Sequence, residues 1–503
     1  MKKIRYPRLA YNKTTLIGLM IFLVTMLTFL ILLFMELAAG SSNPYVGIFV
    51  YMVLPPVALF GLLLIPIGMW RRFKVLQSSD RPDTARFPYV DLNRATHRRT
   101  ALLLLVVALL YSGLAAVGSF QAYHHSESVE FCGATCHVPM KPEYTTYQLS
   151  SHARVACTAC HVGEGVGWYA KSKLSGAYQV YASAFDKFPR PIPTPIKDLR
   201  PARETCERCH WPEKDSGGQQ RLITHYMYDE ENTEWPINLL VKTGGGDPET
   251  GQPEGIHWHM NTAVETEYIA RDPQRQDIPW IRVTERETGR VTVYQDEDDP
   301  LTEEEIAAGP VRRMDCMDCH NRPSHKFRSP DFAVDRALLT GRIPRDLPEI
   351  KRVAVEATAA HYETEEEAHR EIAARIPGFY RKEYPDVSVA RRVDIEKAVV
   401  ATQTLFSQIL FPEMKVRWTD YPDNIGHFIE PGCFRCHTPT KVSEEGWTIT
   451  QDCNVCHSIL SQGSEDRFEM ASSPEGLEFV HPEDIDEEWR ETGCFECHEG
   501  TQP

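Results

Sequence analysis

The chain has 503 residues, a formal net charge of −16 and 42% hydrophobic residues. This length allows two or three domains, each with an ordinary core. The charge is divided unevenly, since residues 1–120 hold 13 basic and four acidic residues and the remainder carries the acidic excess. An acidic exterior of this kind argues against nucleic acid as a partner. It favours either a basic protein partner or simple solubility.

Three apolar segments open the chain, at residues 14–40, 45–70 and 101–120. Each has about the 20 apolar residues needed to cross a bilayer. They predict a mainly α-helical membrane anchor over residues 1–120 with three transmembrane helices. A cleaved signal peptide is the alternative for the first segment, but its length and the two spans that follow speak against it.

Basic residues flank these segments asymmetrically. Residues 1–13 carry five Lys or Arg residues, residues 71–99 carry eight, and residues 41–44 carry none. Because loops rich in Lys and Arg stay in the cytoplasm, the N-terminus is predicted to be cytoplasmic. Everything after the third span is then predicted to lie in the periplasm of a bacterial inner membrane.

All 14 cysteines fall into pairs that are followed directly by a histidine. The pairs are Cys132/Cys136, Cys157/Cys160, Cys206/Cys209, Cys316/Cys319, Cys433/Cys436, Cys453/Cys456 and Cys494/Cys497. The histidines are His137, His161, His210, His320, His437, His457 and His498. Six of the motifs are CxxCH, the attachment signature of c-type haem, and the first has one additional residue between its cysteines.

The motifs therefore predict seven covalently bound c-type haems. Two thioethers hold each porphyrin and the adjacent histidine ligates the iron. Structural zinc would require a second Cys/His pair at matched spacing, and disulfides would require no histidine at all. Haem is thus the interpretation that explains all of these residues.

The haem motifs divide the exterior part of the chain. Four motifs lie in residues 121–345, predicted to form a tetrahaem domain, and three lie in residues 411–503, predicted to form a trihaem domain. Residues 211–315 have strand patterns and one hairpin turning at Thr288 and Gly289, which predicts a small β insert. Residues 346–410 have helical periodicity and are predicted to bridge the two haem groups. The exterior is thus expected to be a haem-packed, loop-rich multihaem cytochrome c domain.

From the third apolar segment to His325, the order of features resembles the NapC/NirT family of membrane-anchored quinol dehydrogenases. The matching stretches are "FCGATCHVPM", "SSHARVACTACH", "CERCH" and "CMDCHNRPSH". The resemblance implies electron transfer from quinol to periplasmic acceptors. Seven motifs on three spans look most like the inner-membrane heptahaem members in metal-respiring bacteria. The first two spans, the long insert and the last three motifs depart from the usual family pattern.

The resemblance also bears on the first motif. In some family members a methionine just after this motif ligates the iron, and Met140 stands three residues after His137. Methionine ligation would raise the potential of this haem relative to one with two histidines. The alternative is that His137 is the ligand and Met140 packs against the ring.

Distal ligands must come from histidines outside the motifs. The resemblance implies His152 and His325. Position in loops before haem motifs favours His427 and His481. His225 is a further candidate, together with one of His257 and His259, which would alternate on opposite faces of a strand. His361 and His369, in the helical segment, are more typical of ordinary surface histidines.

The family's quinol site uses a lysine and an acidic residue downstream of the second haem, and Lys171 and Lys173 are the matching lysines here. The acidic position is Gln179, whose amide cannot accept a proton as a carboxylate would. His124 and His125, at the end of the third span, are candidate replacements, since imidazole titrates near neutral pH.

These features predict a quinol dehydrogenase that passes electrons from menaquinol to a basic periplasmic cytochrome. The alternative is a relay subunit of a larger membrane complex, whose further membrane subunits carry out the quinone chemistry. A terminal reductase of a small oxyanion is disfavoured because the sequence contains no CxxCK.

Overall fold

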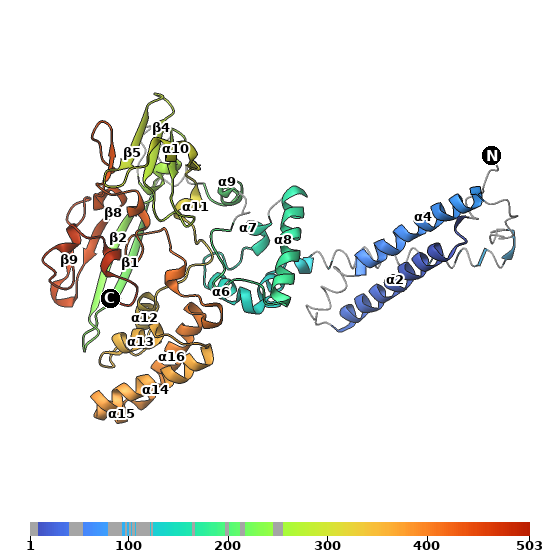
Figure 1. Ribbon diagram of the computed structural model, residues 1–503. Coiled ribbons are helices and arrows are strands. Elements are labelled where there is room, and N and C mark those ends of the chain that lie inside the picture. The colour runs from blue at the N-terminus through green and yellow to red at the C-terminus, as the bar shows by residue number, and fades with distance from the viewer. Residues whose placement is uncertain are drawn as a thin grey trace. The chain divides into compact units, whose positions relative to one another are not determined.

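The computed structural model describes residues 9–39, 54–78, 93–95, 98–99, 124–162, 166–196, 201–211, 217–244 and 255–502, with isolated positions at 102, 106 and 121. The chain divides into two compact units, Met1–Thr135 and Cys136–Pro503. We call them the anchor unit and the exterior unit, and each is described by itself (Figure 1).

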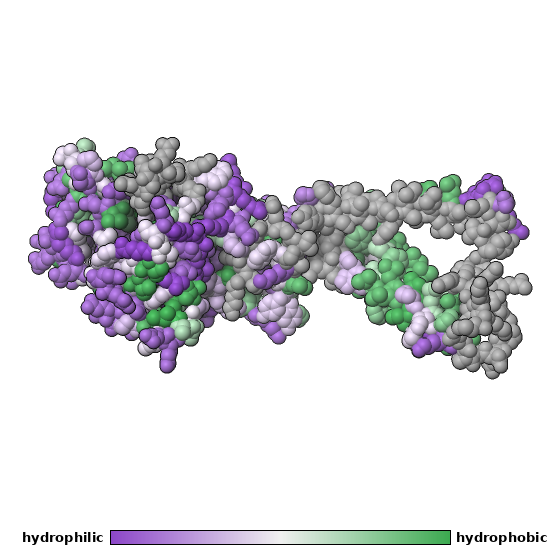
Figure 2. Space-filling view, turned by 90° about the horizontal axis from the view of Figure 1, so that it is seen from above, coloured by the Kyte–Doolittle hydropathy of each residue, from purple (hydrophilic) through white to green (hydrophobic). Residues whose placement is uncertain are grey.

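The anchor unit contains two long apolar helices, α2 (Lys13–Ala39) and α4 (Leu54–Ser78). Stretches of 20 and 23 residues within them, Lys13–Leu32 and Leu54–Leu76, are long and apolar enough to cross a membrane. Most of their large apolar side chains are exposed, as Figure 2 shows in green. Such exposure suits a lipid surrounding rather than water. The predicted third span, residues 101–120, lies outside the described residues apart from 102 and 106.

The two anchor helices approach each other through small residues. A Cβ at Gly18 would lie 2.7 Å from the Gly61 carbonyl oxygen, and one at Gly61 would lie 2.8 Å from the Phe22 nitrogen. Small residues at such crossings allow backbones to pack closely in a membrane, where no hydrophobic effect drives helices together. Helix α4 also extends past the predicted end at residue 70, through a basic turn where Lys74 lies 4.1 Å from the Trp70 ring centre.

The exterior unit is a mixed α/β structure with two antiparallel sheets. One sheet has the order β1-β2-β8-β9, with bounds Gly218–Tyr226, Glu234–Lys242, His457–Gln462 and Glu469–Met470. The other has the order β6-β3-β4-β5-β7, with bounds Arg312–Arg313, Val264–Ile269, Trp280–Glu285, Val291–Asp296 and Lys441–Ser443. The predicted hairpin joins β4 to β5, and Gly289 takes a φ of 71° in its turn. Each sheet combines strands of the insert with strands from residues 411–503, namely β8 and β9 in the first sheet and β7 in the second.

The largest apolar cluster lies mainly among five helices, and we call these helices the helical core. They are α12 (Pro330–Leu339), α13 (Ile350–Ala359), α14 (Glu365–Glu383), α15 (Pro385–Ala390) and α16 (Arg392–Ile409). Ile350, Ile372, Ile376 and Tyr380 are fully buried within this cluster. The helical prediction for this part of the chain is therefore confirmed, with α12 added before it.

Most of the remaining elements are short, apart from two longer helices of 12 and 19 residues that follow the first and second haem motifs. The α-helices are α6 (His137–Gln148), α7 (Cys157–His161), α8 (Val166–Ala184), α9 (Ala202–Cys206), α10 (Glu303–Ala308), α11 (Cys316–Cys319), α17 (Cys453–Cys456) and α18 (Cys494–Cys497). The 3-10 helices are Ile256–Met260, Pro412–Met414, Trp418–Asp420, Gly432–Arg435, Glu465–Arg467 and Glu488–Arg490. A π-helical turn spans Phe131–Thr135. The strand expected around His257 and His259 is wrong, because these residues lie in the Ile256–Met260 turn.

Candidate haem-binding sites

Most CxxCH motifs form one helical turn. The histidine N–H donates to the carbonyl of the first cysteine at 2.9 Å in the third motif, 2.8 Å in the fourth, 3.0 Å in the fifth and 2.9 Å in the seventh. Residues three apart in a helical turn lie on the same face. The two sulfurs of such a motif can therefore reach one edge of a porphyrin, while the histidine continues from the end of the turn.

The attachment cysteines are not equally enclosed. Ten are half-buried, and four are exposed, namely Cys160, Cys209, Cys453 and Cys497.

The third motif is exposed around Cys209, and so are its neighbours Arg208, His210 and Trp211. The Cys209 N–H donates to the Cys206 carbonyl at 3.1 Å and keeps the turn of the motif. The attachment role of Cys209 stays a prediction.

Each of the six regular motif histidines lies opposite one histidine from outside the motifs. The ring-centre distances are 6.3 Å for His161–His325, 6.1 Å for His210–His152, 6.2 Å for His320–His257, 5.8 Å for His437–His259, 6.2 Å for His457–His427 and 6.1 Å for His498–His481. Imidazoles on opposite sides of one metal ion have centres roughly 6 Å apart, since each nitrogen lies about 2 Å from the metal and about 1 Å from its ring centre. The residues therefore fit haems with two histidine ligands.

The outward nitrogens of several rings support the same fit. Nδ1 donates to a backbone carbonyl in five of these histidines, at 2.8–3.1 Å. The donor–acceptor pairs are His152–Pro323, His259–Ile256, His325–Glu143, His437–Thr450 and His481–Glu483. Metal-binding histidines commonly donate one N–H to such a partner, which fixes the ring and leaves the other nitrogen available for the metal.

Burial keeps two of these imidazoles neutral. It lowers the pKa of His259 to about 4 and, helped by the nearby His161, that of His325 to about 4. Both rings are therefore uncharged at neutral pH. An uncharged ring is the form that ligates a metal.

His225 is the distal candidate that the structure does not bring to a motif histidine. Among the described residues its ring neighbour is Phe428, at 5.1 Å between centres, and its Nδ1 lies 3.5 Å from Asp335. His257 and His259 instead both face motif histidines, although the sequence favoured only one of them. The His-x-His spacing was the signal available in the sequence. It was assigned to a strand, in which the two side chains would point to opposite faces, and so only one of them was expected to be a ligand.

The first motif differs from the others in its backbone. Residues Phe131–Thr135, between and around its cysteines, form a π-helical turn, which accommodates one residue more than an α-turn. The extra residue of CxxxCH therefore widens the turn. Met140 lies half-buried in α6, where its N–H donates to the Cys136 carbonyl at 3.0 Å. The choice between His137 and Met140 stays a prediction, since the His137 side chain lies outside the described residues.

The candidate quinol residues of the exterior unit lie on α8. The Lys171 ammonium lies 5.3 Å from the Trp168 ring centre, and the exposed Gln179 donates to Ser175 at 3.3 Å. The same helix and the residue after it expose a stripe of apolar side chains at helical spacing. The stripe consists of Leu174, Tyr178, Tyr181 and Phe185. His124 and His125 belong to the anchor unit, where the His125 ring meets Phe131 edge to face at 5.6 Å.

A buried carboxyl group beside these sites was missed from the sequence. Burial raises the pKa of Glu143 on α6 to about 7, although the nearby Arg322 opposes the shift. The backbone oxygen of Glu143 accepts from His325. A single glutamate in a helix gives no sequence signal for this position, because its burial depends on segments far along the chain.

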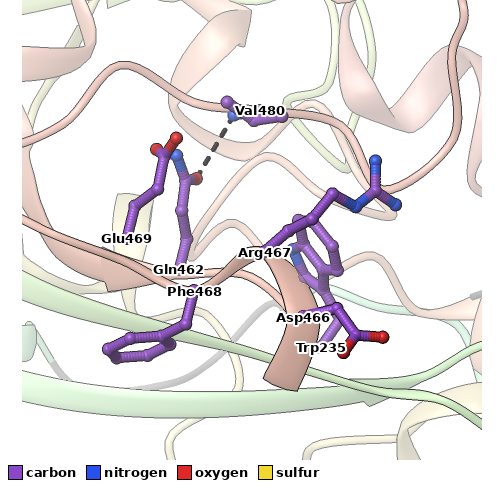
Figure 3. Close-up of a pocket in the computed structure, with 7 residues that line it drawn as sticks. All are labelled: Trp235, Gln462, Asp466, Arg467, Phe468, Glu469 and Val480. Carbon is purple, nitrogen blue, oxygen red and sulfur yellow. Dashed lines mark hydrogen bonds between the residues drawn. The ribbon is translucent and has the colours of Figure 1, made fainter.

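A pocket of about 320 Å³ lies at the edge of the first sheet (Figure 3). Its lining residues are Trp235, Gln462, Asp466, Arg467, Phe468, Glu469 and Val480. The Val480 N–H donates to the Gln462 side chain at 3.2 Å, and the Arg467 guanidinium lies 5.6 Å from the Trp235 ring centre. Its apolar and charged groups form no acid–base pair, so the pocket by itself indicates no reaction.

The fold and these sites define a membrane-anchored multihaem c-type cytochrome, a protein of electron transport. Residues 94–192 match the N-terminal region of the NapC/NirT cytochrome c family. The chain is also 42% identical over 491 residues to the cytochrome c-type protein ImcH of Geobacter sulfurreducens. These aligned residues cover 97% of this chain and 95% of that protein. The chain therefore belongs to the NapC/NirT cytochrome c family. No solved structure matches it.

Proposed function

We propose that the protein is a quinol dehydrogenase of the bacterial inner membrane. It would pass electrons from menaquinol through seven covalently bound haems to a basic periplasmic cytochrome or a similar acceptor. Haem supplies reversible one-electron chemistry when bound. The family membership and the six opposed histidine pairs carry this proposal. We also propose that the N-terminus lies in the cytoplasm and the exterior unit lies in the periplasm.

The histidine pairs would set much of the redox behaviour. Two histidines hold an iron low-spin and give it a lower potential than a histidine and a methionine would. The first motif is then the exception, because Met140 stands one helical turn after His137. Replacing Met140 with Leu should lower the highest midpoint potential in a redox titration. If no midpoint changes, the first haem has His137 as its ligand.

The quinol site is proposed on α8. One of Lys171 and Lys173 would hydrogen-bond the quinol oxygen, and their positive charge would favour the deprotonated quinol, which is oxidised more readily. The apolar stripe on the same helix supports this proposal, because a quinol headgroup carries a long apolar tail. Gln179 would hydrogen-bond to the quinol but would not accept a proton. His124 or His125 would accept the proton instead.

Purified protein in detergent and a menaquinol analogue provide the test. The isolated protein should be reduced by the analogue, and the double variant Lys171→Ala/Lys173→Ala should be reduced more slowly while dithionite still reduces it fully. Lys382→Ala is the matched control, since Lys382 is an exposed lysine on α14. Equal rates for all three proteins would remove these lysines from the site.

The alternative function is a relay subunit whose partner carries out the quinone chemistry. Its supporting observation is Gln179, which replaces the acidic residue of the family's site. Failure of the isolated wild-type protein to accept electrons from the analogue, with normal reduction by dithionite, would favour this alternative.

A further inference from the structure

The Ile256–Met260 turn of the insert carries two histidines that face two different haem motifs. His257 lies opposite His320 of the fourth motif, and His259 lies opposite His437 of the fifth. The fourth motif ends the first haem group and the fifth begins the second. A single short turn therefore reaches both groups.

This turn is held firmly at its start. Gly255 has a φ of 77°, and a Cβ there would lie 2.3 Å from the carbonyl oxygen of Lys242 at the end of β2. Only glycine allows the backbone to approach so closely in this conformation. Within the turn, the His259 Nδ1 donates to the Ile256 carbonyl at 3.0 Å, which fixes the ring. Both histidines therefore stand on one short turn whose backbone is anchored at Gly255.

A buried carboxylate holds the fourth motif. Asp318 stands directly before the second cysteine of this motif and is 2% exposed. Its Oδ1 accepts from the Tyr268 hydroxyl at 2.6 Å, from Arg275 at 2.7 Å and from Arg312 at 2.8 Å. Charge-assisted bonds of this kind are strong and directional, especially where water is excluded.

A buried guanidinium at the equivalent position holds the fifth motif. Arg435 also stands directly before a second cysteine, and it donates to the Asp318 carbonyl at 2.8 Å and to the Arg275 carbonyl at 2.7 Å. Asn424 donates to the same Asp318 carbonyl at 2.9 Å. The two motifs are thus bonded to each other through residues that CxxCH leaves unspecified.

The attachment cysteines of the two motifs are also neighbours. Cys319 of the fourth motif is close enough to Cys433 and Cys436 of the fifth for these groups to interact. This proximity brings the attachment points of the fourth and fifth haems together.

We propose that the Ile256–Met260 turn and the Asp318–Arg435 contact hold the fourth and fifth haems as one rigid pair, and that this pair is the junction at which the two haem groups exchange electrons. The exchange is of single electrons, so one iron is oxidised as the other is reduced and no bond or proton changes place. Asp318 and Arg435 are positioning residues. The inference rests on the proposed haem attachment but requires no quinol chemistry.

The rigid pair is tested by electron paramagnetic resonance of the oxidised holoprotein. His259→Ala should convert the fifth haem from low-spin to high-spin and also alter the low-spin signal of the fourth haem, and His257→Ala should do the reverse. His481→Ala, at the seventh haem, is the control and should change its own signal alone. If His257→Ala and His259→Ala each affect a single haem as this control does, the pair is refuted.

The positioning residues are tested with Asp318→Asn, which keeps size and removes charge. The signals of the fourth and fifth haems should shift together, with seven haems still bound by pyridine haemochrome assay. Glu267→Gln is the control, because it makes the equivalent change in the ion pair between Glu267 on β3 and Arg282 on β4. It should leave both signals unchanged. Asp318→Asn alters the side-chain bonds to Tyr268, Arg275 and Arg312, and Arg435→Met removes the donors to the Asp318 and Arg275 carbonyls. Unchanged signals in both variants would refute the positioning role.

The junction is tested by removing the fifth haem with Cys433→Ser/Cys436→Ser. A menaquinol analogue should then reduce only the haems of the first group, although dithionite reduces all that remain. Removing the seventh haem with Cys494→Ser/Cys497→Ser is the control. In this variant the analogue should still reduce all the haems that remain. Complete reduction of the fifth-haem variant by the analogue would overturn the junction. If the analogue does not reduce the wild type, the proposed function fails while the resonance experiments still decide the pair.

Discussion

The insert and the helical core differ in what they contribute to the exterior unit. The insert has only small apolar clusters, yet its Ile256–Met260 turn places His257 and His259 opposite two motif histidines. The helical core has the largest apolar cluster, but its two histidines are engaged elsewhere. His361 is largely exposed, and the His369 ring is hydrogen-bonded to the Ser407 hydroxyl. In this protein the segment that folds most regularly is not the segment whose histidines lie opposite the motif histidines.

The physical reason lies in how each region is stabilised. Helices α12–α16 bury aliphatic side chains against one another, so their free energy comes mainly from the hydrophobic effect. A haem ligand needs instead a polar ring held at one distance from a metal, which short turns with fixed hydrogen bonds provide.

The largest expected effect is on the turn. Gly255→Val would place a Cβ against the Lys242 carbonyl at a φ that a β-branched residue cannot adopt. Two haems should lose low-spin ligation at once, seen in the visible and resonance spectra of the oxidised protein. The His361→Ala variant should keep the wild-type spectra. Loss of one low-spin haem alone in Gly255→Val would mean that the turn does not act as a unit.

The second prediction concerns Lys351, which is fully buried between Asp331 and Asp335 in the helical core. Lys351→Met should lower the free energy of unfolding by about 3–5 kcal/mol, because it leaves two carboxylates buried without their cation. Thermal unfolding followed by circular dichroism measures this loss. Adding Asp331→Asn and Asp335→Asn should recover much of it, and the haem spectra should stay unchanged throughout.

The third prediction is a pH dependence in the same cluster. Burial raises the pKa of Asp331 to about 6, although the neighbouring Lys351 opposes this shift. Since the folded protein binds this proton more tightly than the unfolded chain, the contribution of Asp331 to stability is present at low pH. It is lost as the pH rises from about 4 to about 6. Asp331→Asn should flatten this part of the stability profile, and an unchanged slope would contradict the assignment.

The smallest expected effect is packing alone. Ile372→Val removes one buried methyl group from α14 and should cost about 1 kcal/mol of unfolding free energy. Val393→Ala, at an exposed position on α16, is the control and should change stability less. Any change in the haem spectra of Ile372→Val would show that the two regions are coupled more closely than their contacts indicate.

The sequence by itself determined the haem motifs, the apolar character of α2 and α4, the hairpin at Gly289 and the helical core. Each of these depends on spacing within one short stretch of chain, such as Cys-x-x-Cys-His or apolar residues at helical intervals. The tertiary structure alone decided which histidine faces which motif, why His225 does not face one, that Cys209 is exposed, and that Asp318 meets Arg435. These features depend on contacts between residues far apart in the chain, and spacing within one stretch of sequence does not determine which distant segments pack together.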